Sequence, residues 1–273
     1  KRRYRSIKKT TKRLTAKNYF SPEMQMRFMG VSQFKAFEKC PAAAMAELSG
    51  QYIRPKTTSL LVGSYVDAHF EGAPDLFKAQ HPELFKRDGG LKSEYIKAEE
   101  IINRIERDEL FMKYMSGAKQ KIFTGEIEGV PIKIKVDSYH PDKIVDLKIM
   151  KDYEPMYVPG EGRQSFIEAW RYDLQGAVYQ EIVYQNTGKK LPFYIAAATK
   201  ETTTDIDIFE VPQELLDYEL GRFKEKVQYY DGIKKGIFDI EPHRCERCDW
   251  CKQTKILRRA KSMEELNDEL CSD

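Results

Sequence analysis

The stretch KIVDLKIM, residues 143–150, places two opposite charges inside a run with the composition of a buried strand. Apolar residues, several of them β-branched, surround Asp146 and Lys148, which lie two positions apart. Side chains at this spacing project from the same face of a strand. A buried charge is costly unless it is paired or binds a metal. The two residues therefore form either a structural ion pair or the lining of a functional site.

The preceding residues predict a hairpin that brings a second acid to the same place. Apolar and polar residues alternate on both sides of the turn signal Glu128-Gly129. In the second strand, PIKIKVDSYH, Asp137 lies on the face opposite the isoleucines, and a short turn leads to KIVDLKIM. Facing side chains of antiparallel neighbours are about 4.5–5.5 Å apart and diagonal ones about 7–8 Å. We therefore expect Asp137 to meet Asp146 and Lys148.

Two carboxylates at this separation repel each other, so they either share a proton or bind a cation. Hard divalent cations, Mg²⁺ above all, are typically held by one or two carboxylates together with phosphate oxygens and water. A lysine two residues along the strand can then polarise a phosphate or help to deprotonate the attacking water. The alternative is an exposed strand face with a casual ion pair.

The rest of the chain predicts helices around these strands, which gives an α/β fold with a central mixed sheet. Ser32 is a candidate helix N-cap, and Pro41 a break in the first helix. Pro212 opens the last helix at its first turn. The expected helices are residues 31–50, 57–72, 92–116, 165–186 and 212–236, and the further strands are residues 193–199 and 205–211.

The composition fits one large domain with a basic arm. Of the 273 residues, 41% are hydrophobic and 33% charged, so the chain can bury a core. The net charge of +3 does not by itself imply a polyanion partner. Residues 1–17 hold nine lysines and arginines and no acid, which predicts either a solvated tail or a nucleic-acid contact. The remainder, residues 18–273, is expected to form a single domain with a cysteine-rich element at residues 241–255. The candidate DNA contacts in the arm are Lys1, Arg2, Arg3, Arg5, Lys8 and Lys9.

The cysteine count and the apolar runs predict a cytoplasmic location. No run is long and apolar enough to span a membrane. No apolar segment follows the basic start, so no secretory signal is expected. Five cysteines, an odd number, argue against a disulfide framework in a chain of this length. The cysteines are therefore expected to be free thiols or metal ligands.

The two central strands resemble a known nuclease superfamily. Asp137 is followed, after eight residues, by Asp146-Leu147-Lys148 on the next strand. This layout is similar to that of the PD-(D/E)XK nucleases. The resemblance implies a restriction-endonuclease-like core in which the two acids hold Mg²⁺ or Mn²⁺. It also implies that the carbonyl of Leu147 is a further ligand and that Lys148 orients the attacking water.

The following helix narrows the resemblance to one branch of the superfamily. Gln175 and Tyr179 match the Q-x-x-x-Y motif of the RecB-like and RecE-like branch, which includes exodeoxyribonuclease VIII and prophage PDDEXK-like proteins. At this spacing the two side chains lie on one helix face. The resemblance covers roughly residues 30–255 and implies that the pair positions the DNA strand or the lysine. A purely structural Gln–Tyr pair is the alternative.

The upstream helix departs from the family pattern, which is G-x-x-x-H. Here Asp67 lies four residues after Gly63, and His69 follows two residues later. A carboxylate is a suitable Mg²⁺ ligand, so the motif position favours Asp67. His69 and Glu71 stay open as alternatives, because the sequence does not fix which face of the helix meets the strands.

The cysteine-rich element predicts a second metal site. The run CERCDWC contains Cys245, Cys248 and Cys251, and a tetrahedral Zn²⁺ or an iron–sulfur cluster needs one more ligand. RecB-like proteins close a cluster with one N-terminal cysteine, so the resemblance implies Cys40 as the fourth ligand and a 4Fe–4S cluster ahead of zinc. His243 is a local alternative for Zn²⁺, and ordinary reduced thiols are the other alternative.

Together these features predict a Mg²⁺-dependent DNA nuclease, an exodeoxyribonuclease of phage recombination type acting on duplex ends. The resemblance further implies a homo-oligomer and a single-strand annealing protein as partner. Two alternatives stay open: a non-catalytic nucleic-acid-binding module, and a decayed nuclease kept as a structural subunit. The paired acids favour the nuclease, because a pure binder has no reason to place two acids near phosphates.

Overall fold

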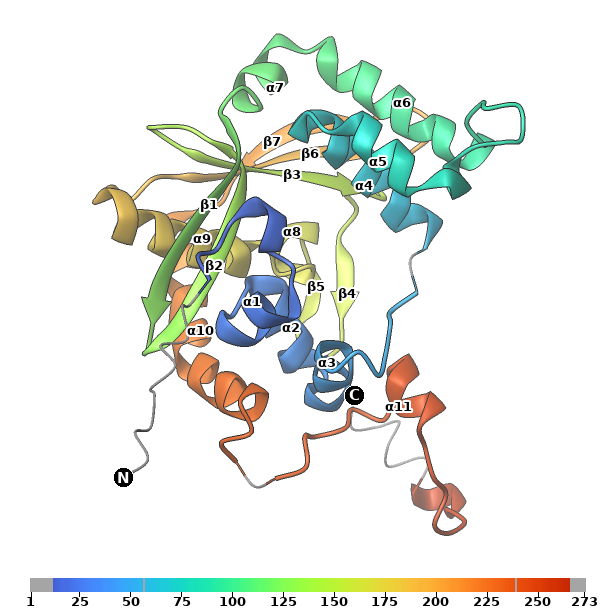
Figure 1. Cartoon of the computed structure of the whole chain (residues 1–273), viewed down its shortest axis with the longest axis vertical. Helices are drawn as coiled ribbons and strands as arrows, with labels where there is room; N and C mark the ends of the chain where they lie inside the picture. The colour runs from blue at the N-terminus through green and yellow to red at the C-terminus, as the bar shows by residue number, and fades with distance from the viewer. Residues whose placement is uncertain (1–11, 56, 239, 266–273) are drawn as a thin grey trace, which may run out of the picture.

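The computed structural model describes residues 12–55, 57–238 and 240–265 and centres on a five-stranded mixed sheet (Figure 1). The strand order is β1-β2-β3-β6-β7, and only the β3–β6 pair is parallel. The α/β fold with a mixed sheet flanked by helices is therefore confirmed. The five strands are β1 (Ala118–Ile127), β2 (Val130–Tyr139), β3 (Ile144–Met150), β6 (Phe193–Thr199) and β7 (Ile206–Glu210).

The predicted hairpin has the register that its turn dictates. Glu128 and Gly129 both have positive φ, 50° and 74°, as a two-residue type I′ turn requires. By contrast, β2 and β3 pair only through Ser138↔Val145 and Tyr139↔Ile144. The two strands therefore separate at the next position, where Asp137 and Asp146 lie.

Two apolar cores lie on opposite faces of the sheet, because successive strand side chains alternate between faces. On β3, Ile144 belongs to the core under α2 (Val31–Lys39), α9 (Tyr172–Thr187) and α10 (Gln213–Lys234). The next residue, Val145, belongs to the core under α4 (Thr58–Glu71) and α6 (Ser93–Glu106). The site described below lies between these layers.

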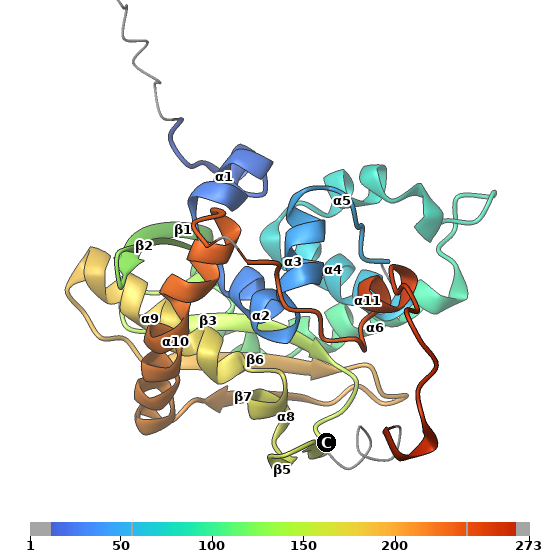
Figure 2. The ribbon, with the colours of Figure 1, turned by 90° about the horizontal axis from the view of Figure 1, so that it is seen from below.

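Shorter elements complete the chain, and the C-terminal segment returns to the N-terminal helices. In Figure 2 the red segment with α11 runs back beside α3, and the two helices are in contact. None of the described helices combines the length and apolarity needed to cross a membrane. The shorter elements are η1 (Ala16–Asn18), α1 (Pro22–Arg27), α3 (Pro41–Leu48), α5 (Pro74–Gln80), η2 (Pro82–Leu84), α7 (Glu109–Tyr114), β4 (Met156–Val158), β5 (Gly162–Gln164), α8 (Phe166–Ala169) and α11 (Asp249–Gln253).

Several predicted helix boundaries are wrong for local reasons. The N-cap of α2 is Gly30, so Ser32 lies inside the helix. Pro212 is the N-cap of α10 rather than a residue of its first turn. The helix expected at residues 92–116 is two helices, because the Asp108 side chain accepts a hydrogen bond from the Phe111 N–H and begins a new one. The break at Pro41 is confirmed, since this proline begins α3.

The helix expected at residues 165–186 is also interrupted, at Arg171. This residue has φ 55°, a left-handed conformation that is rare for a side chain of this size. Its guanidinium donates to Glu38 at 3.0 Å and to Glu219 at 2.7 Å, on α2 and α10. These two ion pairs hold the strained turn from which α9 starts.

The described part of the basic arm packs beside α1. Lys12 forms an ion pair with Glu23 at 3.3 Å, and Arg27 donates to the Lys12 carbonyl at 3.0 Å. The candidate DNA contacts at the start of the arm lie outside the described residues. They are Lys1, Arg2, Arg3, Arg5, Lys8 and Lys9.

Candidate active site

Asp137 lies where the ladder between β2 and β3 opens. Its Oδ2 accepts a hydrogen bond from the Leu147 backbone N–H at 3.0 Å, and its Oδ1 accepts one from Gln120 Nε2 at 3.0 Å. Burial and the negative charge of Asp146 raise the pKa of Asp137 well above its usual range. The carboxyl is thus fixed in place by two donors while its ionised form stays unfavourable.

Asp146 and Lys148 form the ion pair that their spacing predicts, on the face of β3 that meets α9. Asp146 is only 2% exposed, and its Oδ1 accepts from Gln175 Nε2 at 2.7 Å. Burial lowers the pKa of Lys148, but the carboxylates of Asp146 and Asp137 outweigh burial and raise it. The lysine is therefore held protonated beside the two acids.

Helix α4 adds two more carboxylates. Asp67 and Glu71, one helical turn apart, line a cavity of about 10 Å³ together with Gln120 and Asp137. This volume is roughly the space of one water molecule or ion. Burial raises the pKa of Asp67 to about 7, and nearby Glu71 adds to the shift while Lys148 opposes it.

Of the upstream candidates, Asp67 reaches the site and His69 does not. The His69 Nε2 lies 2.7 Å from Glu106 Oε1 on α6, and the residue is not part of the cavity wall. Glu71 lines the cavity and pairs with Lys135 at 3.9 Å. Asp67 and His69 are two residues apart, so they project from different sides of the helix.

Gln175 and Tyr179 lie on one face of α9 and connect the helix to both central strands. Gln175 donates to Asp146 on β3, and the Tyr179 hydroxyl donates to the Lys135 carbonyl of β2 at 3.2 Å. The pair therefore fixes the two strands relative to each other beyond the point where their backbone pairing ends. Leu147, the further predicted ligand, lines the cavity and donates its N–H to Asp137.

Sequence reasoning missed two residues beside the acids. Gln120 has φ 50°, and its buried Oε1 has no hydrogen-bond partner among the described residues. Lys35 belongs to no motif, yet it shares an aromatic partner with Lys148. The Lys35 Nζ lies 5.3 Å from the centroid of the Tyr172 ring, and the Lys148 Nζ lies 4.9 Å from the same centroid. No spacing in the sequence marks either residue, because each comes from a distant element.

The chemistry of this donor set suits a hard divalent cation. Three buried or half-buried acids meet in one place, and the pKa values of Asp67 and Asp137 are raised, first by burial and then by the negative charges of neighbouring acids. The orphaned Gln120 oxygen lines the same ion-sized cavity. Oxygen ligands and carboxylates are what Mg²⁺ and Mn²⁺ prefer.

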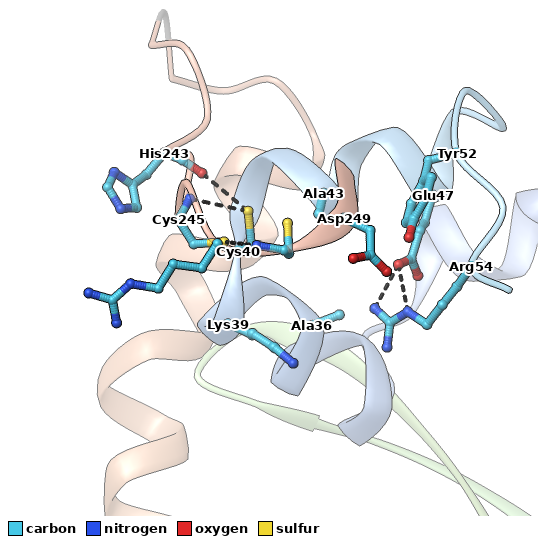
Figure 3. A pocket seen from close by; sticks show the side chains of 12 residues that line it. Ala36, Lys39, Cys40, Ala43, Glu47, Tyr52, Arg54, His243, Cys245 and Asp249 are labelled. Carbon is cyan, nitrogen blue, oxygen red and sulfur yellow. Dashed lines mark hydrogen bonds and ion pairs between the residues drawn. The ribbon is translucent and has the colours of Figure 1, made fainter. Parts of the chain in front are cut away.

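The four predicted cysteine ligands also converge, in a second place. The Sγ atoms of Cys40, Cys245, Cys248 and Cys251 all lie within 4.8 Å of one another. Figure 3 shows Cys40 and Cys245 side by side. The Cys40–Cys251 separation is 3.6 Å. His243 contributes its backbone carbonyl, which accepts from the Ala42 N–H at 3.0 Å, rather than a place in the sulfur cluster.

The environment of these thiols differs from one to the next. Burial raises the pKa of the Cys245 thiol, but N–H donors from Arg247 and Cys248 outweigh burial and lower it to about 6. Burial raises the pKa of Cys251 to about 12. One thiolate is thus stabilised by backbone donors, and a bound cation would be needed to hold the others ionised.

Comparison with known proteins agrees with this geometry. Residues 30–254 match the family described as PDDEXK-like domain of unknown function (DUF3799). A crystal structure described as a putative exonuclease from Eubacterium rectale is 47% identical in sequence, with a TM-score of 0.89 over 93% of this chain and 98% of that one. No curated protein sequence matches the chain. The chain belongs to this PDDEXK-like family and is a member of the PD-(D/E)XK nuclease superfamily.

Proposed function

We propose that the protein is a Mg²⁺- or Mn²⁺-dependent DNA nuclease that hydrolyses phosphodiester bonds from an end. The observation that carries this proposal is the meeting of Asp137, Asp146 and Lys148 where β2 and β3 separate, beside the ion-sized cavity of Asp67. Degradation from an end is supported by the exonuclease described for the structural relative. A reducing compartment suits the free cysteines of the described residues.

The residues that would hold the cation are Asp67, Asp137 and Asp146, with Gln120 as a further oxygen donor. When bound, the cation supplies a Lewis acid, an activated water and a template for the phosphate. Its positive charge also favours the ionised forms of Asp67 and Asp137, whose pKa values are raised by burial and by the neighbouring acids. Phosphate ester hydrolysis needs on the order of 20 kcal/mol of barrier reduction, which explains why so many charges meet here.

The other motif residues would orient the reacting groups. Because two carboxylates keep the Lys148 ammonium protonated, we assign it to the phosphate and the attacking water as a positive charge rather than as a base. Gln175 holds the Asp146 carboxylate through its Oδ1. Tyr179 holds β2 through the Lys135 carbonyl, so both α9 residues act as positioning residues.

The test is cleavage of end-labelled linear and circular duplex DNA with Mg²⁺ or EDTA. The parent should degrade the linear substrate only with the metal and should spare the circle. Asp146→Asn should abolish cleavage, whereas Asp75→Asn, on the exposed part of α5, should cleave like the parent. Cleavage by Asp146→Asn at the parent rate would refute the site. Binding without cleavage in any divalent metal would favour the non-catalytic module.

For the cysteine site we propose a single Zn²⁺ rather than an iron–sulfur cluster. Four thiolates at about 2.3 Å from one zinc ion lie about 3.8 Å apart, close to the 3.6 Å between Cys40 and Cys251. A four-iron cluster places iron and sulfide between the thiolates and therefore needs a wider cage. The homo-oligomer and the annealing partner stay predictions of the resemblance.

A further inference from the structure

Three cavities with shared walls form one groove along α2 and α3. The first, of about 280 Å³, is lined by Gln175 and Tyr179 of the proposed active site. The second has about 450 Å³, and the third, of about 700 Å³, reaches the cysteines (Figure 3). The shared residues are Phe20, Gln25 and Ser32 between the first and second cavities, and Ala36, Glu47 and Arg54 between the second and third.

The end of the groove beside the active site carries a lysine and an open aromatic face. The Lys35 Nζ donates to the Trp170 carbonyl at 3.0 Å and contacts the same Tyr172 ring as the Lys148 ammonium. Phe20, which lines the same cavity, is 68% exposed despite its size. An anionic chain that extends from Lys148 along the groove therefore next reaches the side chain of Lys35.

Positive charge continues toward the cysteines. Lys39 lies one helical turn beyond Lys35 on α2, is exposed, and lines the third cavity. Arg54 lines the second and third cavities and pairs with Glu47 at 2.6 Å. At the far wall, the Tyr52 ring packs 5.7 Å from that of Trp250 on α11, next to the cysteine cluster.

We propose that this groove binds a single DNA strand that runs from the active site to the cysteine cluster. Lysines spaced along a groove match a phosphate backbone, and aromatic faces between them stack with unpaired bases. The bases of an intact duplex already stack on one another, so an exposed Phe20 favours an unpaired strand. The identity of the bound strand as the nuclease substrate rests on the proposed function.

The cysteine cluster joins the two chain segments that form the far wall of the groove. Cys40 lies between α2 and α3, while Cys245 and Cys248 belong to the C-terminal segment that lines the third cavity. The contact between these segments brings Tyr52 and Arg54 to the same cavity. Occupancy of the cysteine site by a metal should therefore support binding of strands long enough to reach it.

The experiment measures binding of fluorescent oligo(dT) with Ca²⁺ in place of Mg²⁺, so that no turnover is required. Strands of about 3 and about 12 nucleotides bracket a short contact and a full groove. The near-end variants are Phe20→Ala and Lys35→Met, with Lys35→Arg to keep the charge. The far-end variants are Lys39→Met and Arg54→Met. The controls outside the groove are Lys86→Met and Tyr218→Ala, both exposed in the described structure.

We expect near-end variants to weaken binding of both strands, with a loss of about fivefold or more for Phe20→Ala. Far-end variants should weaken only the longer strand, and the salt dependence of its log K should flatten by about 0.7 per lost lysine contact. Lys35→Arg should bind like the parent. Burial and the charge of Lys148 both disfavour the Lys35 ammonium and lower its pKa to about 7. Lys35→Met should therefore not lower the melting temperature, whereas loss of a lysine with a purely structural role would lower it.

Parent-like binding by both near-end variants would refute the proposal that the groove binds a single strand. Equal losses of affinity for blunt duplex and for single-stranded DNA would refute it as well. Tighter binding of oligo(rU) that depends on the same residues would replace DNA with RNA as the occupant. If the parent cleaves nothing with Mg²⁺ or Mn²⁺ but these binding losses appear, the proposed nuclease function fails and the groove stands.

Discussion

Replacing Asp67 with asparagine should stabilise the metal-free protein at high pH. A carboxyl pKa raised from 3.8 to about 7 corresponds to about 4 kcal/mol of unfavourable free energy for the ionised form. The side chain keeps part of its surface in water, which screens the neighbouring charges, so we expect about 2 kcal/mol. The raised pKa thus identifies a carboxylate that opposes folding.

The sign of the pH dependence follows from the direction of this shift. Since the pKa in the folded protein lies above that of the unfolded chain, the penalty is absent below pH 3.8 and complete only above pH 7. Asp67→Asn removes the ionisation. Its advantage over the parent should therefore grow between about pH 4 and pH 7 and stay constant above that range.

The assay is thermal unfolding in EDTA at pH 5 and pH 8, followed by circular dichroism. For a chain of this size about 2 kcal/mol corresponds to roughly 4 °C. Asp67→Asn should melt about that much higher than the parent at pH 8 and by a clearly smaller margin at pH 5, while Asp75→Asn serves as an exposed control. Added Mg²⁺ should raise the parent more than the variant, because a ligand of the folded state has been removed. A variant that melts at or below the parent at pH 8 would refute the reasoning.

Three further predictions address the other parts of the molecule. Lys148→Met should keep Mg²⁺ binding by calorimetry while turnover falls by orders of magnitude, and joint loss of both would point to a structural ion pair. Cys248→Ser should release the metal and lower the melting temperature, because a metal bound by both Cys40 and the C-terminal cysteines closes a long loop of the chain. Colourless protein with about one zinc per chain would support the single ion, and brown anaerobic protein would refute it. Gly176→Ala should cost about 1–3 kcal/mol in urea unfolding, because its Cβ would lie 2.5 Å from the Phe193 ring, and an unchanged midpoint would contradict the packing.

The parts of the structure that the sequence predicts are those set by local patterns. Alternation places Asp146 and Lys148 on one face of β3, because a strand has only two faces, and the two-residue turn fixes the register of β1 against β2. Asp137 lies out of phase with Ile132 and Ile134, which share the core of Ile144, so alternation alone does not bring it to Asp146. The i, i+4 spacing likewise places Gln175 and Tyr179 on one face of a helix.

The parts that the sequence does not predict depend on distant partners. The rotation of α4 about its axis is set by its packing on α6 and β3, so the choice between Asp67 and His69 needs the structure. The break before α9 depends on carboxylates of α2 and α10 that bind Arg171. Gln120 has a side chain of no distinctive chemistry, and its role comes only from lying opposite Asp137.

The short ladder between β2 and β3 has a consequence for observing the metal in solution. Because the backbone pairing has ended, the amide proton of Leu147 is protected from exchange by a side chain, the Asp137 carboxylate, at 3.0 Å. A cation that draws this carboxylate toward itself competes for the same oxygen. The exchange rate and chemical shift of one backbone amide thus report on the electrostatic state of the whole acidic cluster, without substrate and without turnover.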